Sequence, residues 1–218
     1  MSAPLRYKGR PVPYITAWRD EKVPQPPVMA TQSGLVYVGT RAGQDETGLL
    51  WRLWDDIQGS GEPLWSDVHA GRQQQAMRQS LCQVCGGPAD RSEQGVLWLL
   101  EDGRAEGPQW PNGFMTTHPP ICVPCAPVAA RLCPHLQREG AVPVRVRTAV
   151  YDAVIGLRYF RSRFGLVAAQ KKEVVLMNAW TAKWVVAGQL VASLDDCTVL
   201  DPAEVGIEAP APRGGFRR

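Results

Sequence analysis

The sequence reads Cys82-Gln83-Val84-Cys85 and then, after 36 intervening residues, Cys122-Val123-Pro124-Cys125. These two pairs contain four of the six cysteines of the chain. Two residues between cysteines allow a tight turn to direct both sulfurs at one point, and two such turns supply the four ligands of a tetrahedral metal site. The spacing therefore predicts one structural zinc ion, bound by Cys82, Cys85, Cys122 and Cys125 in a closed shell with no position for a reactive water.

Two other uses of a Cys-x-x-Cys pair stay open at this point. A disulfide framework suits a short secreted chain, but the N-terminus reads MSAPLRYKGRPVPY and has no apolar signal segment. A redox pair normally occurs singly, near a βαβ pattern. Two distant pairs fit a metal better than either alternative, and reduced thiols indicate a cytoplasmic protein.

The residues around the cysteines predict a local fold. Gly86-Gly87 permits a left-handed turn, and residues 95–100 are apolar like a strand that ends in the turn 101–103. The second pair opens a helix over 126–132, where Pro127 suits the first turn. Turn, hairpin and helix in this order resemble the treble-clef zinc fold.

The N-terminal third predicts a small antiparallel sheet, because short apolar runs alternate with Pro- and Gly-rich turns. A helix over 67–79, capped by Asp67, is polar enough to lie on the surface and leads directly into Cys82. The strands of this sheet are expected at 14–18, 35–38 and 49–54.

The C-terminal third predicts a second sheet and a helix. The helix is expected over 180–194, because Trp180, Trp184, Ala187, Val191 and Leu194 form an apolar stripe at helical spacing. The strands are expected at 142–147, 153–160, 174–177 and 197–200.

These elements together predict an α+β protein in which small antiparallel sheets flank a treble-clef-like zinc module, with a C-terminal helix. Its parts are an N-terminal arm and sheet (1–66), the zinc module (67–137), a basic α+β segment (138–201) and a flexible tail (202–218). The tail is inferred from its Pro and Gly content without a period. No apolar run reaches the roughly 20 residues of a membrane-spanning helix, so no membrane contact is expected.

Charge is distributed unevenly along the chain, although the net charge is only +3. Residues 82–135 carry a net charge of −2 and residues 138–172 carry +6. Cations among aromatic rings favour single-stranded nucleic acid, although a solvated sheet face explains them equally. The candidate nucleic-acid contacts are Arg145, Arg147, Arg158, Arg161, Arg163, Lys171 and Lys172.

The histidines give weak evidence for catalysis. His118 precedes Cys122 by four residues, and treble-clef nucleases of the HNH class combine structural cysteines with catalytic histidines. That class carries a histidine on the hairpin strand and another on the helix, whereas 95–102 and 126–132 contain none. His118 is therefore expected on the surface or behind the metal ligands, and no catalytic residue is assigned.

The two remaining cysteines are expected to be small buried hydrophobes. Cys133 lies eight residues beyond Cys125, which is about 12 Å along a regular helix and out of reach of the same ion. His135 is expected near the end of this helix, close to its last carbonyls. Cys197 is expected inside a strand.

The segments LCQVCGGPADR, GVLWLL, PPICVPCA and CPHL resemble a set of uncharacterised zinc-binding proteins common in actinobacteria. The resemblance implies the four metal ligands and a bacterial cytoplasmic setting. The leading hypothesis is a non-catalytic zinc protein that binds another protein as an accessory or regulatory factor. The alternatives are a nucleic-acid-binding protein that uses residues 138–172, and a degenerate HNH-like nuclease or biosynthetic-cluster enzyme.

Overall fold

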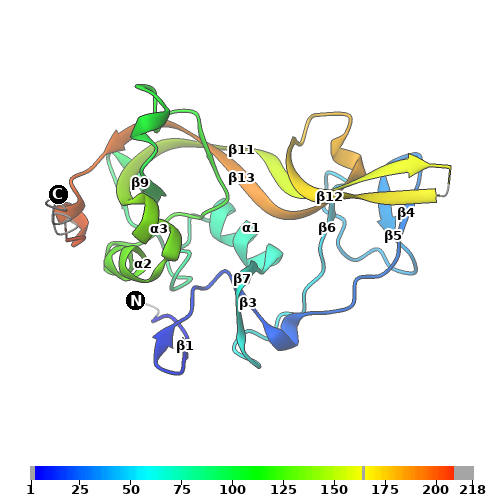
Figure 1. Cartoon of the computed structure of the whole chain (residues 1–218), viewed down its shortest axis with the longest axis horizontal. Helices are drawn as coiled ribbons and strands as arrows, with labels where there is room; N and C mark the ends of the chain where they lie inside the picture. Colours follow the sequence, from blue (N-terminus) through cyan, green and yellow to red (C-terminus); the bar gives the residue numbers. More distant parts are fainter. Residues whose placement is uncertain (1–2, 164, 209–218) are drawn as a thin grey trace, which may run out of the picture.

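A seven-stranded sheet forms the centre of the molecule, in a computed structural model that describes residues 3–163 and 165–208. Five strands lie in the order β10-β13-β11-β9-β8, while β12 pairs with β11 and β6 pairs in parallel with β13. Three short helices pack near this sheet, and α2 and α3 lie beside β9 at one end (Figure 1). The predicted α+β class is confirmed, but the small antiparallel sheet expected from the N-terminal third is wrong. Its three strands pair with different partners, β3 with β7, β5 with β4, and β6 with β13 of the central sheet.

The bounds of the elements follow the chain order. The strands are β1 Arg6–Tyr7, β2 Arg10–Pro11, β3 Thr16–Trp18, β4 Val28–Ala30, β5 Leu35–Tyr37, β6 Leu50–Trp51, β7 Pro63–Val68, β8 Arg91–Ser92, β9 Gly95–Glu101, β10 Phe114–Thr116, β11 Ala141–Ser162, β12 Gly165–Leu176 and β13 Val185–Val199. The helices are α1 Ala70–Arg78, α2 Ala126–Leu132 and α3 Pro134–Glu139. The 3-10 turns are η1 Arg19–Glu21, η2 Arg104–Glu106, η3 Val123–Cys125, η4 Ala182–Trp184 and η5 Pro202–Val205.

The helix expected over 180–194 is wrong. Only Ala182–Trp184 forms a 3-10 turn, and Val185–Val199 is the strand β13, which pairs with β11. Burial on both faces of a strand removes the alternation that identifies strands in sequence, and Val185, Leu190, Val191 and Leu194 are all buried here. Three residues of the expected stripe, Ala187, Val191 and Leu194, are buried on this strand together with Leu190 and Ala192, so their spacing imitates a helical stripe.

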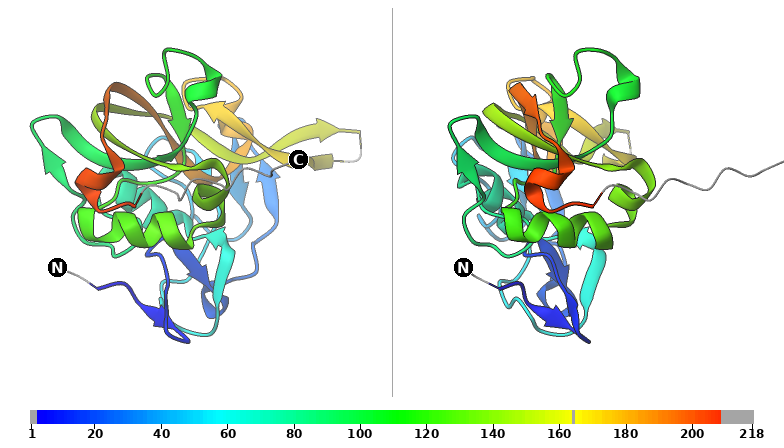
Figure 2. Two further views of the ribbon diagram at one scale, coloured as in Figure 1. Left: turned by 60° about the vertical axis from the view of Figure 1, so that its left-hand side comes forward. Right: turned by 90° about the vertical axis from the view of Figure 1, so that its left-hand side faces the viewer.

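Strand β11 joins two strands that the sequence separates. It runs through 22 residues, pairing first with β9 and β13 and later with β12 and β13. Beyond Arg158 it pairs only with β12, and this two-stranded end projects from the body in both Figures 1 and 2. We call residues 157–163 and 165–172 the β11–β12 arm.

Three apolar cores support the sheet. The largest lies between β9, β11 and β13, and includes Trp98, Val144 and Leu194. A second surrounds the cysteines and includes Leu97 and Ile121. A third, centred on Leu35, Tyr37 and Leu50, supports the base of the β11–β12 arm through Tyr159 and Leu166.

The helix α1 is not the polar surface helix that the sequence indicates. Gln73 is fully buried, and its side-chain amide donates to the carbonyls of Thr117 and Leu190 and accepts from the Leu190 N–H. The N-cap is His69 rather than Asp67, because the His69 Nδ1 accepts from the Arg72 N–H. The buried side chain of Gln73 therefore holds α1 against β13 through hydrogen bonds to the Leu190 backbone.

A buried ion pair fixes the N-terminal segment to α1. Glu21 is 0% exposed and accepts from Arg72 at 2.5 Å and 2.7 Å, and also from the Trp18 N–H at 2.7 Å. Arg72 donates further to the carbonyls of Tyr14 and Thr16. Such a pair is stable only when its remaining hydrogen-bonding groups are satisfied, and the two backbone carbonyls help to meet that requirement.

The segment after residue 201 begins with ordered structure instead of a flexible tail. Asp201 caps the 3-10 turn Pro202–Val205 by accepting from the Ala203 N–H. Val205 and Ile207 are buried in the core beside the cysteines. The rest of the expected tail, 209–218, lies outside the described residues. Among the described residues, the helices are too short or too polar to cross a bilayer.

Candidate metal centre

The first cysteine pair lies in a turn that follows α1. The Leu81 N–H donates to Ala76, the Cys82 N–H to Gly87, and the Gly86 N–H back to Cys82. Gly86 has a φ of +71°, and an added Cβ would lie 2.7 Å from the Tyr14 ring. A glycine is therefore required here both by the backbone conformation and by the close approach of the N-terminal segment.

The second pair lies at the start of α2. The N–H groups of Cys125 and Ala126 both donate to the Cys122 carbonyl, which forms the turn η3. The preceding residue Ile121 donates to Leu97 of β9 and accepts from Asp90, so the hairpin β8–β9 holds the segment before Cys122 in place. The helix predicted over 126–132 is confirmed as α2.

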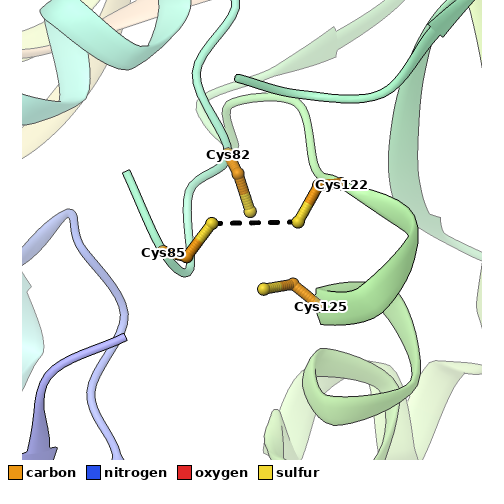
Figure 3. A group of neighbouring side chains, drawn as sticks. All are labelled: Cys82, Cys85, Cys122 and Cys125. Atoms are coloured by element: carbon orange, nitrogen blue, oxygen red, sulfur yellow. Dashed lines mark hydrogen bonds between the residues drawn. The ribbon is translucent and has the colours of Figure 1, made fainter. Parts of the chain in front are cut away.

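The four sulfurs converge on one point between these two turns. Figure 3 shows the Cys82, Cys85, Cys122 and Cys125 side chains turned toward one another. All four Sγ atoms lie within 4.8 Å of one another, and those of Cys85 and Cys122 are 3.8 Å apart. A tetrahedron with metal–sulfur bonds of about 2.3 Å has edges of about 3.8 Å. The cluster therefore has the size of a four-thiolate metal site.

The 3.8 Å between the Sγ atoms of Cys85 and Cys122 is too long for a disulfide bond. A disulfide joins its sulfurs at about 2.05 Å, and all six cysteines are free thiols. The four sulfurs come from both pairs and meet in one group, whereas a redox pair needs only its own two. Metal binding thus explains the arrangement of the sulfurs better than either alternative weighed from the sequence.

Burial makes the thiols of Cys82 and Cys125 poor acids in the absence of a cation. It raises the pKa of Cys82 to about 12 and, with the neighbouring thiols, raises the pKa of Cys125 far above its usual range. At Cys85 burial also opposes ionisation, but the Gly87 N–H and the neighbouring thiols outweigh it and lower the pKa. A bound divalent cation reverses this preference, because a coordinating thiol is deprotonated outright.

The other two cysteines lie outside this group. Cys133 follows α2 in an extended conformation and caps α3, as expected for a residue before proline. It is half-buried rather than buried. Cys197 is half-buried on β13, where burial raises the pKa of its thiol to about 11.

The histidines do not form a catalytic arrangement with the metal ligands. His118 is exposed, as expected, and its N–H contacts the Thr116 hydroxyl. His135 lies in the first turn of α3 instead of at the C-terminal end of a helix, and its Nδ1 is 3.1 Å from the Arg138 guanidinium. Neither α2 nor the strand β9 carries a histidine.

A second cluster, formed by Glu21, Asp56 and His69, also meets the distance criterion for metal ligands. Its donor atoms are already occupied. The His69 Nδ1 accepts from Arg72 and its Nε2 lies 3.1 Å from the Asp55 carbonyl, while Glu21 is bound to Arg72. This cluster is explained by the ion pair that holds the N-terminal segment.

The candidate nucleic-acid contacts fall into two groups at opposite ends of β11. Arg145 is only 9% exposed and pairs with Asp90 at 2.8 Å, so it holds the hairpin beside the cysteines. Arg147 lies near it, 3.5 Å from Asp196. Arg158 lies eleven positions after Arg147 along the strand, which is about 36 Å at the rise of a strand. The other five candidates lie on the β11–β12 arm.

Sequence reasoning located the four cysteines but missed the cavity beside the arm, which depends on contacts between distant segments. No local signal marks it, since its walls come from distant segments, among them residues 25–28, residues 66–68, Leu157, Lys172 and Gly188. Comparisons of the chain with protein-family models, with curated proteins and with solved structures give no match. The function is therefore inferred from the residues of this chain.

Proposed function

We propose that this chain is a non-catalytic zinc-binding protein in which one structural Zn²⁺ joins the turn at Cys82–Cys85 to the start of α2. The observation that carries the proposal is the convergence of four Sγ atoms within 4.8 Å. Four thiolates in a tetrahedron are typical of zinc or iron. The turn, the hairpin β8–β9 and the helix α2 follow one another in the order of a treble clef, which supports a structural site.

Metal analysis of the purified protein tests this proposal. We expect one zinc per chain, and cobalt substituted for zinc should give the intense visible absorption of tetrahedral thiolate coordination. Protein that is folded without metal, or that holds iron in place of zinc, would overturn the proposal. Cys133→Ala provides the matched control, because its thiol lies outside the cluster and should not change the zinc content.

The proposed role is to bind another protein as an accessory or regulatory factor. Two features support a binding role. Four thiolates close the metal shell, so no position remains for substrate or water. Trp180 is 76% exposed and follows the exposed Val174 and Leu176 by a few residues, and exposed tryptophan is typical of protein interfaces. Loss of partner binding in Trp180→Ala with unchanged zinc content is the expected result.

Nucleic-acid binding through the β11–β12 arm is a second candidate. Residues 155–184 contain six cations and one carboxylate, and much of this segment projects from the body (Figure 1). Lys171 and Lys172 are exposed, and Arg161 lies 5.5 Å from the Trp184 ring centre. Binding of a labelled single-stranded oligonucleotide should weaken steeply as salt rises, because cations that contact phosphates release counterions. Absence of binding at low salt would exclude this candidate.

A further inference from the structure

A cavity of about 530 Å³ lies between the inner face of the main sheet and the N-terminal segment. Its floor is formed by β11, β12 and β13, and its other walls by Pro26, Pro27, Val28, Tyr37 and residues 66–68 of β7. None of these residues belongs to the metal centre. The walls are apolar over much of their area, which is typical of small-molecule sites of this size.

The register of the sheet explains how the floor is built. Leu50, Val186, Leu157 and Lys172 pair in turn across β6, β13, β11 and β12, so they lie in one row. Residues paired in this way share a face of the sheet. Arg52 follows Leu50 at one end of the row and Lys172 lies at the other, about 14 Å away across three strand spacings.

Two irregularities of the sheet open this floor. The pairing of β11 with β13 shifts between Ile155 and Gly156, which leaves Gly188 as an extra residue, and both Gly188 and Gln189 line the cavity. A second shift follows Leu157, opposite Lys172. Bulges of this kind redirect side chains and are frequent beside functional sites.

Several polar side chains that line the cavity have no hydrogen-bond partner among the residues that the structure describes. Apart from the contact of the Arg52 guanidinium with the Trp54 ring at 4.6 Å, no hydrogen bond or ion pair joins the side chains of Arg52, Tyr159, Lys172 or Gln189 to another described residue. The cavity thus offers two cations, with Asp67 as its single carboxylate. Burial raises the pKa of Tyr159 above its usual range, and burial raises the pKa of Tyr37 to about 12, so both tyrosines are neutral.

We propose that this cavity binds a small organic anion with a flat apolar body. The guanidinium of Arg52 receives the anionic group, because it is half-buried and its planar donors suit a carboxylate, sulfonate or phosphate. The proline and tyrosine walls contact the apolar body, and Lys172 adds a weaker, solvent-screened attraction at the open end. This site is independent of the proposed role of the metal.

Two fluorescent probes separate the contribution of charge from that of shape. The first is 8-anilinonaphthalene-1-sulfonate, and the second is N-phenyl-1-naphthylamine, which has the same rings without the sulfonate. We expect the sulfonate probe to bind more tightly. Arg52→Gln should weaken its affinity by about tenfold and leave the neutral probe unchanged. Equal affinity for both probes, or no effect of Arg52→Gln, would overturn the assignment of an anion.

Gly188→Leu tests the position of the site. Gly188 lies outside the left-handed backbone region, and an added Cβ meets only the Ile155 carbonyl oxygen at an ordinary 3.6 Å. The leucine should therefore fill the cavity without moving the strand, and it should reduce the affinity for both probes by at least about tenfold. Gly188→Ala is the graded control and should have a smaller effect.

Circular dichroism and zinc content are measured on the same samples. A Gly188→Leu protein that keeps its fold and zinc but still binds both probes would place the binding elsewhere and overturn the proposal. If Gly188→Leu does not fold, Arg52→Gln and Lys172→Gln still decide the question, because no hydrogen bond or ion pair joins either side chain to another described residue. Failure of the proposed zinc site would appear as lost metal and would leave the probe results interpretable.

Discussion

The two ends of strand β11 show two different ways of holding a sheet in place. At the metal end, Ala141–Val146 pairs with β9, and Val144 onward also pairs with β13, so the backbone is bonded on both edges. At the arm end, the last residues pair only with β12. A two-stranded hairpin is at best marginally stable alone, and here the third core and the strand β4 support its base.

The difference extends to charge. At the metal end Arg145 is neutralised by Asp90, whereas the arm exposes Lys171 and Lys172. Cysteines and ion pairs thus stabilise the first end, while the second leaves Lys171 and Lys172 exposed to solvent or a partner. A single strand can therefore form part of a core at one end and an exposed surface at the other, depending on which strands pair with its edges.

The largest effect is expected when the metal end loses a ligand. Cys82→Ser should remove most of the zinc and cost several kcal/mol of folding free energy, because metal binding contributes directly to folding. Loss of zinc would show in elemental analysis, and loss of stability in urea unfolding. A chelator should produce the same change in the unmodified protein. A Cys82→Ser protein with full zinc content and stability would contradict the structural assignment.

The segment between the two ends depends on a buried ion pair instead of a metal. Glu21→Ala leaves the buried Arg72 guanidinium with only the exposed carboxylate of Asp56, 3.5 Å away, as an ion partner, so we expect a loss of about 3–5 kcal/mol with unchanged zinc content. Chemical unfolding provides the measurement. Glu62→Ala is the matched control, since its pair with Arg19 is exposed and should contribute little. An equal loss of unfolding free energy in the two variants would show that burial of the Glu21–Arg72 pair does not determine its contribution to stability.

Charge reversal tests whether the β11–β12 arm is the surface that binds nucleic acid. Arg161→Glu with Lys171→Glu should weaken oligonucleotide binding by at least about tenfold and flatten its dependence on salt. The folding free energy should change little, because both residues are exposed. Reversal of the exposed Arg91 and Arg131 at the metal end is the control. If the control weakens binding as much as the arm variant does, the contacts lie at the metal end.

A smaller loss of folding free energy is expected at acid pH, when His69 at the N-terminus of α1 becomes protonated. Burial first, and then the Arg72 charge, lower the pKa of His69 below its usual 6.5. The unfolded state therefore binds the proton more readily, so stability falls as the pH decreases below about 6.5. His69→Asn keeps an N-cap and removes this titration. The difference in unfolding free energy between the two proteins should narrow toward acid pH, and a constant difference would contradict this account.

The smallest effects are expected at the cysteines outside the cluster. Cys133→Ala and Cys197→Ala should each cost at most about 1 kcal/mol, because both side chains are half-buried and small. Zinc should stay at one per chain. Zinc loss in Cys133→Ala would mean that this thiol replaces one of the four predicted ligands. The metal site would then not be formed by the two Cys-x-x-Cys pairs alone.

The chain's own order of residues was sufficient to identify the cysteine cluster. Two residues between paired cysteines impose the geometry of a turn, and that constraint is local. The strand β9 and the helix α2 were also predictable, because an apolar run between turns and a helix opened by Pro127 are local patterns.

Tertiary structure alone decided the rest. The strand β13 could not be distinguished from a helix by periodicity, because it is buried on both faces and its identity comes from pairing with β11. The division of the basic residues between two ends of one strand, and the cavity between β13 and the N-terminal segment, arise from contacts over long sequence separations. Such contacts depend on how the whole chain packs, so they cannot be predicted from any short segment of the sequence.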